Sequence, residues 1–112
     1  MIKKIMELEN KYNITGDEPF YGDSFIRKYY CKPTEDLYTF LNKYTNNLYV
    51  DTGWEMLDSI TLEIEKDLSL VVATWEDDED DYPIEINEAI TIKVENHIDF
   101  YDSLLSIIIC EE

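Results

Sequence analysis

Apolar residues recur at every second position through much of the C-terminal half, which is the period of a β-strand. In residues 60–65, Ile, Leu and Ile alternate with Thr and Glu, so one face of the predicted strand is apolar and the other is mostly acidic. Lys66 and Asp67 then form a short hairpin connection. Residues 68–75 are apolar on both faces, which predicts a central strand.

The alternation resumes after Pro83, where the apolar residues occupy even-numbered positions. Glu88 interrupts this series and predicts a β-bulge or a bend. The three segments together predict an antiparallel meander, in which the residues 76–81 connect the second strand to the third. The apolar members of the third strand are Ile84, Ile86, Ile90, Ile92 and Val94.

Three other segments have the spacing of an amphipathic helix. The first covers residues 2–12, the second begins after Thr34 as its N-cap and ends at Asn46-Asn47, and the third begins after Asn96. Asp99 lies in the capping-box position relative to Asn96. The predicted apolar stripes are Ile2, Ile5, Met6 and Tyr12 for the first helix, Leu37, Phe40, Leu41 and Tyr44 for the second, and Ile98, Tyr101, Leu104, Leu105 and Ile108 for the third.

Two segments are less clear. Residues 19–31 alternate in the manner of a strand, although Ser24 could cap a short helix there, and residues 48–50 form a possible short strand. We expect one α+β domain spanning residues 1–112, in which N- and C-terminal helices cover one face of an antiparallel sheet of three to four strands.

Composition supports a folded chain rather than an acidic disordered tail. Of the 112 residues, 45% are hydrophobic and 13% aromatic, despite a net charge of −17. We find neither a membrane-spanning apolar run nor a signal peptide. Cys31 and Cys110 fit neither a disulfide framework nor a metal motif, so we expect a cytoplasmic protein with reduced thiols, with a single disulfide left open.

The negative charge is confined to one part of the chain. Residues 1–50, predicted as the mainly helical half, hold seven acids and seven bases, whereas residues 51–112 hold 19 acids and two bases, Lys66 and Lys93. Such asymmetry favours a one-sided acidic face, although acidity that serves only solubility is the simpler alternative.

Six consecutive acids, Glu76–Asp81, are the densest part of this region and predict a solvated loop, because neighbouring carboxylates repel. The strand alternation also places Glu63, Glu65, Glu85 and Glu95 on the open face of the sheet. We therefore predict a partner-binding surface on this face and on the adjoining loop. Its residues are Glu63, Glu65, Trp75, Glu76, Asp77, Asp78, Glu79, Asp80, Asp81, Tyr82 and Glu85.

No motif in the sequence predicts a catalytic site, a metal site or a cofactor. Asp77, Glu79 and Asp81 alternate as in a calcium-binding EF-hand loop, but Tyr82 occupies the position that needs glycine. His97 is the single histidine, and no glycine-rich phosphate loop is present. We do not expect an enzyme, and direct binding of nucleic acid is disfavoured because the acidic surface would repel phosphates.

Consecutive carboxylates on an extended chain match the charge spacing of one DNA strand, roughly one per 3.4 Å. The sequence thus predicts a non-enzymatic inhibitor that blocks a basic protein acting on nucleic acid, such as a nuclease. Toxin-immunity proteins and phage or plasmid anti-CRISPR or anti-restriction proteins work in this way. The alternatives are a small adaptor protein that binds through its Tyr-rich first half, or a cation-binding module at the acidic loop; an exposed strand edge could also support a homodimer or pair with a partner strand.

Overall fold

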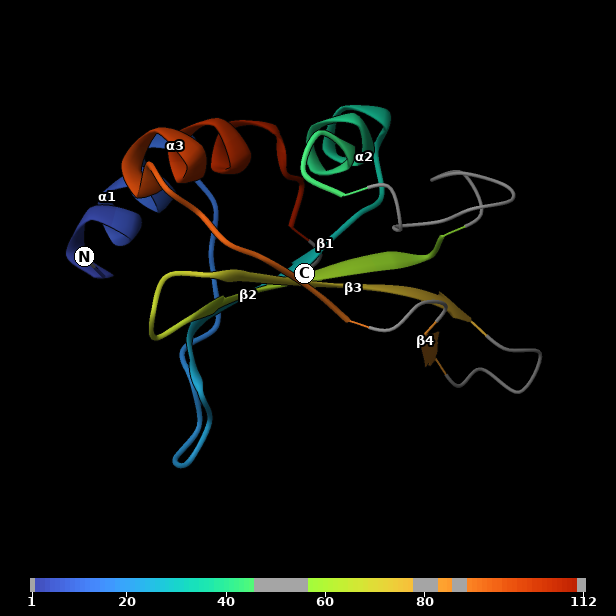
Figure 1. Ribbon diagram of the computed structural model, residues 1–112, viewed down its shortest axis with the longest axis horizontal. Helices are drawn as coiled ribbons and strands as arrows, with labels where there is room; N and C mark the ends of the chain where they lie inside the picture. Colours follow the sequence, from blue (N-terminus) through green and yellow to red (C-terminus); the bar gives the residue numbers. More distant parts are fainter. Residues whose placement is uncertain (1, 46–56, 78–82, 86–88, 111–112) are drawn as a thin grey trace.

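The computed structural model describes residues 2–45, 57–77, 83–85 and 89–110. In this part of the chain, α1 (Ile2–Tyr12), α2 (Glu35–Asn42) and α3 (His97–Ile107) lie on one face of an antiparallel sheet (Figure 1). The fold is therefore α+β, as predicted, with helices from both ends of the chain and a sheet between them. The prediction assigned only the N- and C-terminal helices to this face, and α2 lies over it as well (Figure 1).

The sheet is built around β3 (Leu70–Asp77), the predicted central strand. On one side, β3 pairs with β2 (Ser59–Glu65), which pairs with β1 (Phe25–Cys31). On the other side, β3 pairs with both β4 (Pro83–Glu85) and β5 (Ile90–Ile92). These two short strands take the place of the single long third strand that the sequence predicts.

The register shows why the third strand divides. Trp75 lies opposite Glu85 and Val72 lies opposite Ile90, so the numbering advances by five from Glu85 to Ile90 while it changes by three on β3. The register of β5 against β3 is therefore shifted relative to that of β4, and Glu88, where the sequence predicts a bulge or a bend, lies outside the described residues. Val94, predicted as part of the strand, follows the end of β5.

The ambiguous segment before residue 31 is a strand. Arg27, Tyr29 and Cys31 are buried and lie opposite the core residues Ile64, Leu62 and Ile60 of β2. Phe25 is also buried, but a register shift before Arg27 places it opposite Glu65, and its ring centre lies 5.7 Å from Lys28 Nζ on the open face. Ser24 caps no helix; its carbonyl oxygen accepts a hydrogen bond from the Lys66 backbone N–H at 3.3 Å. This bond joins the start of β1 to the β2–β3 hairpin. The possible strand at residues 48–50 lies outside the described residues.

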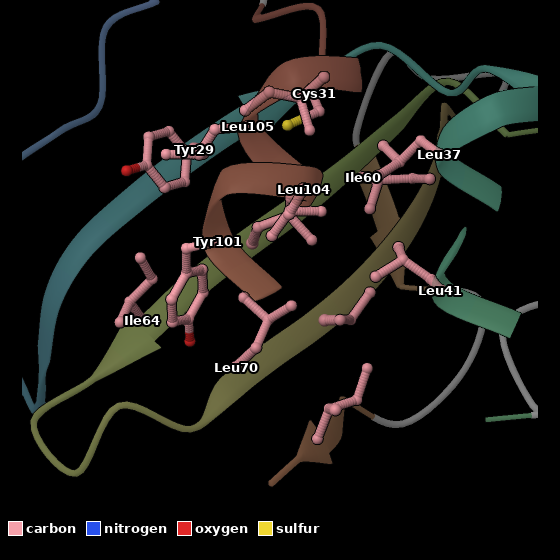
Figure 2. Packing of buried hydrophobic residues seen from close by; sticks show 14 of the residues in the cluster. Tyr29, Cys31, Leu37, Leu41, Ile60, Ile64, Leu70, Tyr101, Leu104 and Leu105 are labelled. Carbon is pink, nitrogen blue, oxygen red and sulfur yellow. The ribbon is translucent and has the colours of Figure 1, made fainter. Parts of the chain in front are cut away.

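The core lies between the helices and the sheet (Figure 2). Ile60, Leu62 and Ile64 project from β2 toward the helices, as the period of two predicts, and all three are fully buried. Leu104 and Leu105 of α3 pack over them (Figure 2). Each such side chain contributes about 1.5–3 kcal/mol when it leaves water, so this layer is the main source of stability.

The starts of the helices agree with the predicted signals, but α2 ends at Asn42 and not at the predicted Asn46-Asn47. Thr34 is the N-cap of α2, and its Oγ1 accepts a hydrogen bond from the Leu37 N–H at 3.2 Å. In α1, Ile5 is buried as predicted, whereas Ile2 and Met6 are exposed. The side of α1 that faces the sheet carries Glu9 instead of a purely apolar stripe.

Three further predictions about the helices are wrong in detail. Ile98 is exposed and Phe100 takes its place in the core, because α3 turns the residues 100, 101, 104 and 105 toward the sheet. The Asn96 side chain donates to the Asp99 carboxylate at 2.8 Å rather than capping the backbone, so no capping box forms. Tyr44 lies beyond the end of α2 and is exposed.

The outer edge of β1 is covered by two segments of the same chain. Asp17 and Lys28 exchange backbone hydrogen bonds of 2.7 and 2.9 Å. At the other end of the strand, the Lys32 N–H donates to the Ile109 carbonyl at 2.8 Å. These positions of β1 therefore do not provide the exposed strand edge that the sequence predicts.

Candidate functional site

The structure places six of the predicted partner-binding residues. Glu63 and Glu65 lie on β2, Trp75, Glu76 and Asp77 on β3, and Glu85 on β4. Glu76 and Asp77, predicted to begin a loop, form the last two residues of β3 and pair with β4. The other five predicted residues lie outside the described residues: Asp78, Glu79, Asp80, Asp81 and Tyr82.

Four acidic residues are carried by the backbone where β3 pairs with β4 and where β2 begins, and we call Asp58, Glu76, Asp77 and Glu85 the acidic end of the sheet. Asp58 precedes β2 and was not among the predicted site residues. Its backbone N–H donates to the Trp75 carbonyl at 2.8 Å, and its carboxylate accepts a hydrogen bond from the Asp77 N–H. Glu85 lies opposite Trp75 in the register. Backbone pairing therefore fixes the main chain that carries these four charges.

The charge of the acidic end is not neutralised by the bases described in the structure. None of the ion pairs between described residues includes a member of this group. Lys66 lies in the β2–β3 hairpin, and Lys93 follows Ile92, which faces Leu70 at the start of β3. Both lysines therefore lie near the start of β3, and the acidic end lies at its other end. The strand spans roughly 23 Å from Leu70 to Asp77, which exceeds the electrostatic screening length of about 8–10 Å at moderate ionic strength.

The open face of the sheet is less acidic than predicted. Glu63 forms an ion pair with Lys28 at 3.3 Å, and Lys28 also lies 5.1 Å from the centre of the Tyr30 ring. Burial opposes the charged form of Lys28, but the contacts with Tyr30 and Glu63 outweigh it and raise the lysine pKa. Glu63 therefore takes part in a cross-strand ion pair with Lys28 of β1, and it adds little to the negative electrostatic potential of the open face.

Of the two remaining glutamates predicted on the open face, Glu65 lies at the end of β2, whereas Glu95 lies on the helical side of the sheet. Glu65 is half-buried at the end of β2, opposite Phe25. Glu95 was predicted on the open face, but it follows β5 and lines a cavity with Phe40 and Phe100 on the helical side. The prediction for Glu95 is wrong because the strand ends at Ile92 and the chain then turns toward α3.

Trp75 is the aromatic residue next to the acidic end. Its indole N–H donates to the Thr61 hydroxyl oxygen at 3.0 Å, and the side chain is half-buried on the open face. The bond holds the ring between β2 and β3. Tryptophan is enriched among residues that dominate protein–protein binding energy, so a fixed, partly exposed ring beside four carboxylates suits a protein partner.

A second cluster of charged residues, missed from the sequence, is buried between α1 and β1. The Glu9 carboxylate accepts hydrogen bonds from Arg27 Nε at 2.7 Å, Arg27 Nη2 at 2.5 Å, the Tyr29 hydroxyl at 2.6 Å and the Gly16 N–H at 3.3 Å. Burial acts to raise the pKa of Glu9, but the bonds from Arg27 and Tyr29 and the Arg27 charge bring it below its ordinary value.

The Glu9 cluster is a structural connection and not a site open to a ligand. Glu9 and Arg27 are 4% and 6% exposed, and every bond reaches from α1 to β1 or to the segment before β1. Gly16 belongs to this arrangement because a Cβ there would lie 2.6 Å from Cε1 of Tyr29. The sequence does contain one signal for this cluster. Glu9 follows Ile5 by four residues and therefore lies on the same, buried side of the helix.

Within the described residues, no group of three or more His, Cys, Asp or Glu side chains could hold a metal ion. The segment that partly resembles a calcium-binding loop, from Asp77 onward, lies mostly outside those residues. None of the helices that the structure describes has both the length and the apolar character needed to cross a membrane. In comparisons with known proteins, no family model, curated protein or solved structure matches this chain.

Proposed function

We propose that this protein is a non-enzymatic inhibitor that binds a basic, nucleic-acid-acting protein through the acidic end of the sheet. The observation that carries the proposal is the adjacent backbone placement of Asp58, Glu76, Asp77 and Glu85, which have no ion-pair partner among the described residues. In the sequence, the run of acids from Glu76 continues to Asp81.

Fixed carboxylates are suited to occupy a groove that normally receives phosphates. Bringing four like charges together is unfavourable in the isolated protein, and a cationic surface would relieve the repulsion. Association driven in this way is fast and weakens with salt. A toxin nuclease, a CRISPR effector and a restriction enzyme each have such a groove, so toxin immunity and phage or plasmid counter-defence are the two settings that we propose.

The test is capture of partners from a lysate of the source organism by three forms of the protein. The first is wild type. The second neutralises the acidic end with Asp58→Asn, Glu76→Gln, Asp77→Asn and Glu85→Gln. The third is a control that removes the same number of charges at exposed positions away from this end: Glu7→Gln, Glu35→Gln, Asp36→Asn and Glu95→Gln.

The proposal predicts that wild type and the control capture the same basic nuclease or nucleic-acid-binding protein, and that added DNA or RNA displaces it. The acidic-end variant should lose this partner while keeping its thermal melting temperature. Retention of the partner by the acidic-end variant would overturn the proposal.

One observation favours a different class, an adaptor that binds through the Tyr-rich half. Phe20 and Tyr21 are 82% and 108% exposed at the tip of the turn before β1. The turn is ordered by bonds in both directions, from the Asp23 N–H to the Phe20 carbonyl and from the Phe20 N–H to the Asp23 carboxylate, and Gly22 has a φ of 91°. If the protein is such an adaptor, the double variant Phe20→Ser with Tyr21→Ser should fail to capture the partner, and the acidic-end variant should capture it as wild type does.

A further inference from the structure

The two cysteines of the chain lie opposite each other across two paired segments. Cys31 is the last residue of β1 and is fully buried, and Cys110 forms an antiparallel bridge with it from the C-terminal segment. Figure 2 shows the Cys31 sulfur in the core below the helices, near Leu105. Both residues are reduced thiols in the structure.

The type of pairing decides whether the two sulfurs can join. The Lys32 N–H donates to the Ile109 carbonyl, and this bond flanks the Cys31–Cys110 pair, which makes it a non-hydrogen-bonded pair. In such pairs the Cα atoms are about 4.5 Å apart and the side chains project to the same face. Disulfides need a Cα separation of about 4.4–6.8 Å, so this pair can be bridged without moving the backbone.

The surroundings of Cys110 distinguish it from Cys31. Cys110 is half-buried and lines a cavity of about 860 Å³ with Thr15 and Tyr30. The contact with the Cys31 side chain lowers the pKa of Cys110, and the neighbouring Thr15 backbone N–H lowers it further, to about 7 against the opposing effect of burial. A thiol with these properties is accessible and substantially ionised near neutral pH, whereas Cys31 has no exposed surface.

We propose that Cys110 and Cys31 form a peroxide-responsive pair, in which Cys110 reacts with a small hydroperoxide and Cys31 resolves the product into a disulfide. The Cys110 thiolate attacks the hydroperoxide, so that an S–O bond forms, the O–O bond breaks and an alcohol leaves after protonation. Cys31 then gives up its proton and attacks the Cys110 sulfur, forming the S–S bond and releasing water. The two thiols lose two electrons and two protons, and the hydroperoxide is reduced to alcohol and water.

The disulfide would fasten the C-terminal segment to the outer edge of β1. That segment already supplies the Ile109 bond to Lys32, so oxidation adds a covalent link to an existing contact and closes a loop of the chain between residues 31 and 110. This consequence is independent of the acidic end, which the crosslink does not touch.

The test uses the full chain, reduced and then treated with hydrogen peroxide at pH 7. We expect the intact mass to fall by two hydrogens, peptide mapping to join Cys31 to Cys110 within one chain, and the melting temperature to rise by roughly 10 °C until dithiothreitol reverses it. The rate of thiol loss should increase with pH through about 7. No intramolecular disulfide, or oxidation of Cys110 to sulfinic acid while Cys31 remains a thiol, would overturn the proposal.

Single substitutions separate the two roles. Cys110→Ser should slow thiol loss at least tenfold, because the remaining Cys31 is buried. Cys31→Ser should leave a sulfenic acid on Cys110 that dimedone traps, and Cys31→Ala serves if the serine is not tolerated in the core. Equal reaction rates for Cys110→Ser and wild type would contradict the assignment of Cys110 as the attacking thiol.

Discussion

Replacing Glu9 by Gln tests whether the buried cluster between α1 and β1 holds these elements together. The substitution keeps the shape of the side chain but removes the charge that compensates Arg27, whose side chain is 8% exposed. Removing one partner of a buried ion pair costs about 3–5 kcal/mol, because the other charge is left buried. Glu18 lies 3.9 Å from Arg27 Nη1 but is 79% exposed and compensates only weakly.

We therefore expect Glu9→Gln to lower the free energy of unfolding by about 3 kcal/mol, a large share of the 5–15 kcal/mol typical of a domain. With a urea dependence of about 1.5 kcal/mol per molar, the midpoint of urea unfolding should fall by roughly 2 M. Glu7→Gln on the exposed side of the same helix is the matched control and should change the free energy by less than about 0.5 kcal/mol.

The same cluster gives a pH dependence with a definite sign. Because the pKa of Glu9 is lower in the folded protein than its ordinary value of 4.5, its contribution is fully present above about pH 5 and is lost as the pH falls through the folded-state pKa. Wild type should lose more stability than Glu9→Gln over this acidic range. Equal urea midpoints for Glu9→Gln and Glu7→Gln at pH 7 would refute the reasoning.

Two further substitutions test local packing and capping. Gly16→Ala should lower the free energy of unfolding by about 1–3 kcal/mol, since the new Cβ would lie 2.6 Å from Tyr29 Cε1; an unchanged urea midpoint would show that the ring can move aside at no cost. Thr34→Ala should cost about 1 kcal/mol by removing the bond from the Leu37 N–H, and Thr34→Ser should retain most of the stability. A serine variant as unstable as the alanine variant would argue against the cap.

The elements of the fold could be predicted because their signals are local. The period of two in residues 60–65 and the Thr34 cap each depend on neighbouring residues, and both are confirmed. The division of the third strand into β4 and β5 depends on its register against β3, which involves residues on another strand. The alternation within residues 84–94 alone predicted one continuous strand.

The candidate site shows the same limit. Glu76, Asp77 and Glu85 were predicted from charge and alternation, whereas Asp58 joins them only because β2 returns beside β3. Glu9 and Arg27 are 18 residues apart in sequence and meet across α1 and β1. The opposition of Cys31 and Cys110 requires the C-terminal segment to reach the edge of β1, and no local pattern around either cysteine contains that information.

We propose that the acidic end binds a basic partner through charge held by the sheet. The most direct measurement is the Kd of the captured partner for wild type, the acidic-end variant and the charge-matched control, at low and physiological salt. We predict that the acidic-end variant binds roughly 30-fold more weakly than the other two at low salt, as four pairs of about 0.5 kcal/mol each imply, and that its affinity depends less on salt. Equal affinities and equal salt dependence for all three proteins would contradict the account.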